Sequence, residues 1–139
     1  MQALPVRLRP QQDLRSALDA ILGDAGLGAA FVVQGIGSLS VARIRLAGMS
    51  DALELRGDLE ILTLAGSLSP DGSHLHISVA DAQGRVVGGH AAPGCIVRTT
   101  AEILLALLSG FRFAREPDAA SGWNELAIHA SDDGDPAAR

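Results

Sequence analysis

The sequence predicts an α+β fold, a single domain built from a largely antiparallel β-sheet with one main amphipathic helix. Its 139 residues fall within the usual size of one domain. Hydrophobic residues make up 47% of the chain and aromatic residues only 3%, so the core must consist of aliphatic side chains. Sixteen glycines and six prolines separate short apolar runs, which is typical of strands joined by tight turns. We expect the domain to span residues 1–130 and residues 131–139 to form a disordered tail.

One helix is predicted near the N-terminus. Its apolar positions, Leu14, Leu18 and 21–22, recur at offsets of four, seven and eight, which is the spacing of one helical face. Asp13 can accept the hydrogen bonds that begin a helix, and Gly26 favours its end.

The remaining apolar runs predict strands, because they are short and several alternate with polar residues. We expect strands at residues 6–8, 29–33, 40–46, 59–68, 74–80, 85–90 and 123–130, with the second closed by a sharp turn at Gly35-Ile36-Gly37. Residues 96–108 suit a buried strand and a buried helix alike, and we favour a strand at their start only.

The charge and the lengths of the apolar stretches argue against two classes of partner, nucleic acids and membranes. The net charge is −5 and the chain has no run of Lys or Arg, whereas nucleic-acid binders normally present a positive surface to the phosphates. No stretch approaches the roughly 20 apolar residues that a membrane span needs. We therefore expect a cytoplasmic protein with no membrane contact, and the single Cys95 excludes an intrachain disulfide.

Three histidines are candidates for a metal site. His74 and His76 are two residues apart on a predicted strand, so their side chains leave the same face. The position of His90 depends on the hairpin loop. A two-residue loop at Ala82-Gln83 pairs residue 75 with 90 and separates the histidines, whereas a three-residue loop with a left-handed Gly84 pairs 76 with 90 and brings them together.

Three imidazoles with an open fourth position suit a divalent metal ion, zinc being the best match, with nickel, copper and iron as alternatives. The alternative interpretation is that all three are ordinary surface or core histidines. His129 has no evident partner and is interpreted as structural. Cys95 could offer a thiolate, but a single cysteine is more often a small core residue.

Two glutamates, Glu60 and Glu102, interrupt apolar runs. Either could orient a histidine or act in proton transfer, and the alternative for each is a structural ion pair.

Several motifs occur in an order and spacing that resemble the PPC domain family, the plant and prokaryote conserved domain that accompanies AT-hook motifs in plants. They are Gly35-Ile36-Gly37-Ser38, Gly57-Asp58-Leu59-Glu60-Ile61-Leu62, His74-Leu75-His76-Ile77-Ser78, Gly88-Gly89-His90 and Arg98-Thr99-Thr100-Ala101-Glu102. The resemblance covers residues 6–128. It implies an α+β subunit assembled as a homotrimer, and it places His74, His76 and His90 on the histidine cluster of the family, where a metal is expected.

The chain also departs from the family. Plant members have Arg and Phe where this chain has Asp58 and Leu59, in a segment associated with docking to transcription factors, and the AT-hook is absent. Three hypotheses follow: a stand-alone homotrimeric binding or regulatory module, as in bacterial members, with a three-histidine metal site; a DNA-associated transcriptional regulator; and a metal-dependent enzyme.

Overall fold

A computed structural model describes residues 1–131 of the chain, which fold as mostly antiparallel β-sheet with one short helix in a single domain. The predicted tail at 131–139 lies outside the described residues except for Ser131. The elements, in chain order, are β1 (Gln2–Leu8), α1 (Leu14–Asp24), β2 (Ala30–Arg45), β3 (Ala52–Leu68), β4 (His74–Ala80), β5 (Val86–Ala91), β6 (Ile96–Leu107), β7 (Phe111–Pro117) and β8 (Asn124–Ala130). Because α1 has only 11 residues, the α+β description fits loosely.

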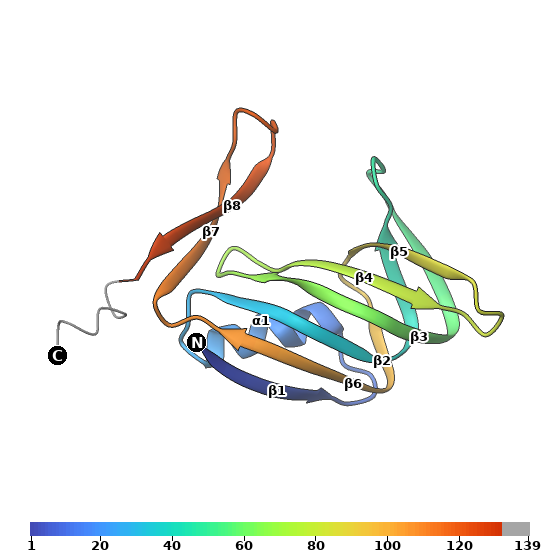
Figure 1. The fold of residues 1–139 in the computed structure, drawn as a ribbon. Helices are drawn as coiled ribbons and strands as arrows, with labels where there is room; N and C mark the ends of the chain where they lie inside the picture. The colour runs from blue at the N-terminus through green and yellow to red at the C-terminus, as the bar shows by residue number, and fades with distance from the viewer. Residues whose placement is uncertain (132–139) are drawn as a thin grey trace.

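Six strands form one sheet in the order β1-β6-β2-β3-β4-β5, and β2 also pairs with β5. This extra pairing closes β2, β3, β4 and β5 upon themselves at one end of the sheet. The last two strands form a separate hairpin, β7–β8, that projects away from the sheet (Figure 1).

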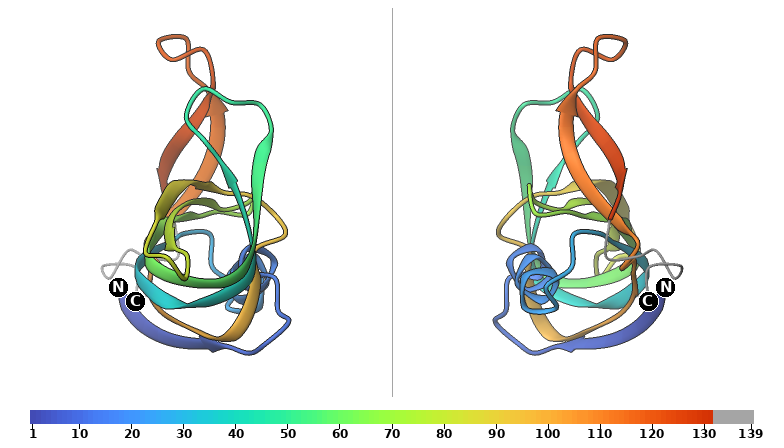
Figure 2. Two further views of the ribbon diagram at one scale, coloured as in Figure 1. Left: turned by 90° about the vertical axis from the view of Figure 1, so that its right-hand side faces the viewer. Right: turned by 90° about the vertical axis from the view of Figure 1, so that its left-hand side faces the viewer.

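The hydrophobic core lies inside the curled sheet, with α1 packed against one side (Figure 2). The helix buries Leu14, Leu18 and Leu22, which contact the inward-facing aliphatic residues of the strands. Its predicted beginning is confirmed, since the Asp13 carboxylate accepts a hydrogen bond from the Ser16 backbone N–H at 2.9 Å. The chain leaves the helix through Gly26, whose φ is +63°.

The predicted turn at Gly35-Ile36-Gly37 is wrong, because these residues lie within the single long strand β2. Gly35 and Gly37 instead allow β2 to pack closely against its neighbouring strands. A Cβ on Gly37 would overlap the Thr100 carbonyl of β6, and one on Gly35 would lie 2.9 Å from the Cβ of Leu64 on β3. The chain therefore needs glycine here to let backbones and side chains approach, and it does not reverse direction.

Other boundaries also differ from the prediction. Strand β3 begins seven residues before the predicted 59, at Ala52, and β6 remains a strand to Leu107 rather than at its start only. The second half of β6 alternates between buried residues such as Ile103 and Leu105 and more accessible neighbours. Strand β7 was not predicted, because only two of its residues, Phe113 and Ala114, are buried.

The alternation of residues along the strands gives the sheet an outward face opposite the core. Directly opposed residues of antiparallel strands share a face. Ser67 and His74 are opposed across β3 and β4, and Glu102 is opposed to Ile36 across β6 and β2. The outward face therefore carries five of the candidate site residues, namely Glu60, His74, His76, His90 and Glu102. Cys95 lies in the core and His129 in the projecting hairpin. Within residues 1–131, no helix is long and apolar enough to cross a membrane.

Candidate metal centre

The register of the β4–β5 hairpin brings the histidines together. His76 is directly opposed to His90, as the three-residue loop predicts. Asp81 and Arg85 close that loop, because the Asp81 N–H donates to the Arg85 carbonyl at 3.0 Å. Gly84 has a φ of +77°, the left-handed conformation that the prediction required. The Asp81 carboxylate also accepts from the Arg85 N–H at 3.0 Å and side chain at 2.7 Å, which fixes the turn.

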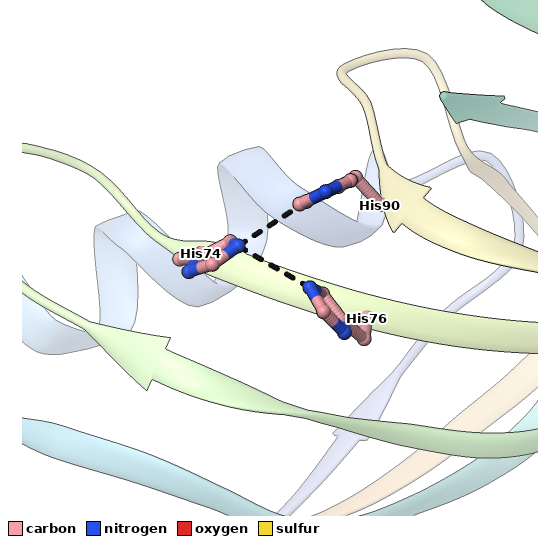
Figure 3. Close-up of side chains that lie close together, drawn as sticks. All are labelled: His74, His76 and His90. Atoms are coloured by element: carbon pink, nitrogen blue, oxygen red, sulfur yellow. Dashed lines mark hydrogen bonds between the residues drawn. The ribbon is translucent and has the colours of Figure 1, made fainter. Parts of the chain in front are cut away.

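The three imidazoles face one another on the outward face of the sheet (Figure 3). The Nε2 of His74 lies 3.2 Å from the Nδ1 of His90 and 3.3 Å from the Nε2 of His76. All three ligand atoms lie within 4.8 Å of one another. Two nitrogens bound tetrahedrally to zinc, each at 2.0–2.1 Å from the ion, are separated by about 3.3 Å. Two of the three nitrogen pairs therefore have the spacing of ligands to one metal ion, and the third pair lies within 4.8 Å.

The surroundings favour the neutral form of two of these rings, which is the form that binds metal. Partial burial is the main cause that lowers the pKa of His74, followed by the positive charge of Arg115 and then by the other two histidines. The carboxylate of Glu125 opposes this effect. The pKa of His90 is lowered chiefly by burial and next by Arg45.

The two arginines near the site were missed by the sequence analysis. Arg115 belongs to the projecting strand β7, and its guanidinium donates to the Ser67 hydroxyl at 2.9 Å. Its position depends on tertiary structure alone, so no local pattern could have indicated it. Arg45 is directly opposed to His90 where β2 pairs with β5. It lies on an alternating strand, but the closure of the sheet that places it there leaves no signal in the sequence.

Two other candidates, Cys95 and His129, have structural roles. Cys95 is completely buried in the core, which confirms its interpretation as a small core residue. Burial also raises the pKa of its thiol. His129 was expected to lack a partner, and this is wrong. Its Nε2 lies 2.7 Å from a carboxylate oxygen of Glu116, across the β7–β8 pair. The interaction joins the two strands of that hairpin and is separate from the histidine cluster.

Glu60 and Glu102 both lie on the outward face and are exposed. Glu60 is opposed to Ser38 on β2, and Glu102 is opposed to Arg7 on β1. Within residues 1–131, neither carboxylate hydrogen-bonds to an imidazole or belongs to the group of close metal-ligating atoms.

A family model described as the Plants and Prokaryotes Conserved (PCC) domain matches residues 1–109. Among curated proteins, the chain is 51% identical over 128 residues to the bifunctional protein GlmU of Synechococcus sp. (strain JA-3-3Ab). The match covers 92% of this chain but only 21% of that protein, so the chain spans about a fifth of the length of the curated relatives that it matches.

Solved structures share the fold over nearly their whole length. A hypothetical protein from Salmonella is 39% identical, with a TM-score of 0.90 and coverage of 93% of this chain and 94% of that chain. A metal-containing protein from Archaeoglobus fulgidus is 25% identical, with a TM-score of 0.76 and coverage of 91% and 94%. A protein from Bacteroides thetaiotaomicron, given a DNA-binding role only provisionally, is 23% identical, with a TM-score of 0.80 and coverage of 90% and 91%, and it shows the fold alone.

Proposed function

This chain belongs to the Plants and Prokaryotes Conserved domain family, and from its histidine geometry we propose that it is a homotrimeric binding or regulatory module that holds a divalent metal ion. The observation that carries the proposal is the pair of nitrogen separations, 3.2 and 3.3 Å, centred on His74. These separations match those of nitrogens that share one tetrahedral metal ion. The metal-containing neighbour from Archaeoglobus fulgidus also supports a metal in this fold.

We propose zinc as the ion. Imidazole nitrogens suit zinc, copper, nickel and iron, and zinc accepts three protein ligands without a preferred geometry of its own. His74, His76 and His90 would leave one position open for water or a small ligand, as in catalytic zinc sites. A metal-dependent enzyme would use the same site, with its substrate at the open position. In it, Glu60 or Glu102 of a neighbouring subunit would move protons at the metal.

Metal analysis tests the proposal directly. We expect the protein purified without added metal and then dialysed against zinc to retain about one ion per chain. The His76→Ala variant should fall to background, because two imidazoles alone hold zinc far less tightly. His129→Ala is the matched control, since its imidazole pairs with Glu116 on another part of the surface. Equal zinc content in the parent and the His76→Ala variant would refute the metal site.

The outward face supports the homotrimer. Its side chains include several exposed apolar residues, namely Phe31, Val33, Ile36, Leu62 and Leu104. A shallow depression of about 560 Å³ beside them is lined by Pro5, Val6, Arg7, Gln34, Glu102, Ile103 and Leu104. The apolar run at 103–108 contributes less than its composition suggests, because Ile103, Leu105 and Leu107 are buried in the subunit's own core. Several large apolar side chains exposed on one face are typical of an interface.

We expect light scattering at micromolar concentration to give the mass of a trimer. Introducing a charge at one of these exposed apolar residues, with Leu62→Asp, should shift the mass towards that of a monomer. Leu53→Asp serves as control, because Leu53 has a similar exposure of 41% but lies opposite Ile44, near the turn that joins β2 to β3. A monomeric parent protein would contradict the proposal.

A DNA-associated regulator is the alternative, and the provisional role of the Bacteroides neighbour is what favours it. The net charge of −5 opposes autonomous binding to duplex DNA, since few phosphates can be neutralised. We expect the protein alone to bind duplex DNA in the non-specific range, weaker than about 1 μM at physiological salt, with affinity falling steeply as salt rises. A submicromolar, sequence-selective complex in a gel-shift assay would reverse this preference.

Two further predictions from the sequence remain proposals. We propose that the domain ends near residue 130, where β8 ends at Ala130. We also propose a cytoplasmic location, which the single free thiol of Cys95 supports because a reducing compartment keeps thiols unpaired.

A further inference from the structure

We propose that the open position of the metal centre takes a small oxyanion, a phosphate or carboxylate group, held between Arg115 and Arg45. This inference rests on the proposed metal site and names the class of ligand that the site accepts. It follows from two arginines that lie next to the histidine cluster on different elements of the fold, Arg115 beside His74 and Arg45 beside His90.

Arg115 is fixed beside His74. Its guanidinium donates to the Ser67 hydroxyl at 2.9 Å, and Ser67 is the residue directly opposed to His74 across β3 and β4. Its backbone N–H donates to the Asp71 carboxylate at 2.9 Å, which fastens strand β7 to the turn before β4. One hydrogen bond to a hydroxyl uses only part of a guanidinium, which has five N–H donors. The remaining donors are available to an acceptor at the cluster.

Arg45 approaches from the other side. It is directly opposed to His90 across β2 and β5, so the two side chains leave the same face of the sheet. A donor of its guanidinium reaches the Met49 carbonyl at 3.3 Å, in the turn that joins β2 to β3. Within residues 1–131, neither Arg45 nor Arg115 forms a salt bridge, whereas Arg43, Arg56, Arg85 and Arg98 all do.

The charged side chains beside the cluster are mostly positive. Arg115 lies next to His74 through Ser67, and Arg45 lies opposite His90. Glu125 is a carboxylate whose charge also acts on His74. A divalent ion bound by three neutral imidazoles adds two further positive charges. The site would thus be strongly cationic in its loaded form, although the protein as a whole is acidic.

This distribution of charge selects the ligand. A cationic or neutral ligand at the open position would leave both guanidinium groups without a counter-charge beside a divalent cation. An oxyanion can place one oxygen on the metal and offer others to the arginine donors, an arrangement in which charge-assisted hydrogen bonds are short and strong. Arginine also matches the planar oxygen pairs of carboxylate and phosphate better than lysine does.

Cobalt-loaded protein tests the inference, because the visible absorption of Co²⁺ changes when an anion replaces a bound water. We would titrate the loaded parent and its variants with inorganic phosphate, and repeat the titration with acetate. The parent should show saturable spectral changes. Arg115→Gln and Arg45→Gln should each weaken phosphate binding at least tenfold while retaining cobalt. Arg112→Gln is the matched control, because Arg112 lies three residues earlier on β7 and packs near Gly28 on the other side of the strand.

Each outcome decides a separate question. Cobalt retained with equal phosphate affinity in the parent and both variants would overturn the oxyanion site and leave the metal site standing. No cobalt in the parent would overturn both. Arg115 also ties β7 to the sheet, so Arg115→Gln could lower stability without touching the ligand. Arg45 does not tie β7 to the sheet, so its replacement avoids this effect. Unchanged phosphate affinity in Arg45→Gln alone would refute the proposal that the two arginines hold the anion together.

Discussion

Zinc should raise the thermal unfolding midpoint of this protein by roughly 15 °C when its free concentration is about a thousand times its dissociation constant. A ligand that binds only the folded state stabilises it by about 4 kcal/mol at that excess, and a domain of this size gains a few degrees per kcal/mol. The unfolded chain separates His90 from His76 by the whole hairpin, so it cannot offer the same three nitrogens. Differential scanning calorimetry at one fixed protein concentration measures the shift.

The same experiment should show a defined dependence on pH. The pKa values of His74 and His90 are lowered in the folded protein, so below the ordinary value of 6.5 the unfolded chain takes up protons first. The stability that these two rings contribute is therefore present above pH 6.5 and is lost as the pH falls through their lowered values. Protons also compete with zinc for the imidazole nitrogens. Both effects have the same sign, and scans with and without a chelator separate them.

His129→Ala again provides the control, because its removal should leave the zinc-induced shift intact. In the His74→Ala variant the shift should vanish, since His74 is the ring that lies within 3.3 Å of both others. A zinc-induced shift of the same size in His74→Ala would mean that the ion stabilises the protein from another site.

The convergence of the histidines could be predicted because it is local. The two-residue spacing of His74 and His76 sets their common face, and the Ala82-Gln83-Gly84 loop sets the partner of His90. Both depend on the period of a strand and on the left-handed conformation that glycine allows. The α1 boundaries follow from similar local signals, the Asp13 cap and Gly26.

What escaped prediction depends on packing between distant segments. Gly35 and Gly37 have the composition of a turn, but they are required where β2 passes close to β3 and β6. The approach of Arg115 to His74 requires β7 to be placed beside β4, and Phe113 contributes to that placement by packing edge-to-face on Phe31 with ring centroids 5.3 Å apart. The sequence therefore indicates the candidate metal ligands, whereas the charge that surrounds them becomes visible only in the fold.

Gly66→Ala should be the most damaging single substitution beside the site, with a loss of about 3–5 kcal/mol in the free energy of unfolding. Gly66 has a φ of +152° and is opposed to Leu75, the residue between His74 and His76. A Cβ there would overlap the His74 carbonyl and lie 2.9 Å from the Cα of Leu75. Backbone atoms cannot rotate away as a flexible side chain would, so β4 must separate from β3 at Leu75 and distort the segment that holds His74 and His76.

Gly84→Ala is the matched control, because Gly84 also has a positive φ but an added Cβ would meet nothing within 4 Å. It should lose only about 1–2 kcal/mol, the cost of the left-handed conformation. Urea denaturation and zinc analysis of both variants check the comparison, and a Gly66→Ala protein as stable and as zinc-loaded as Gly84→Ala would show that β4 is not held in place by this contact.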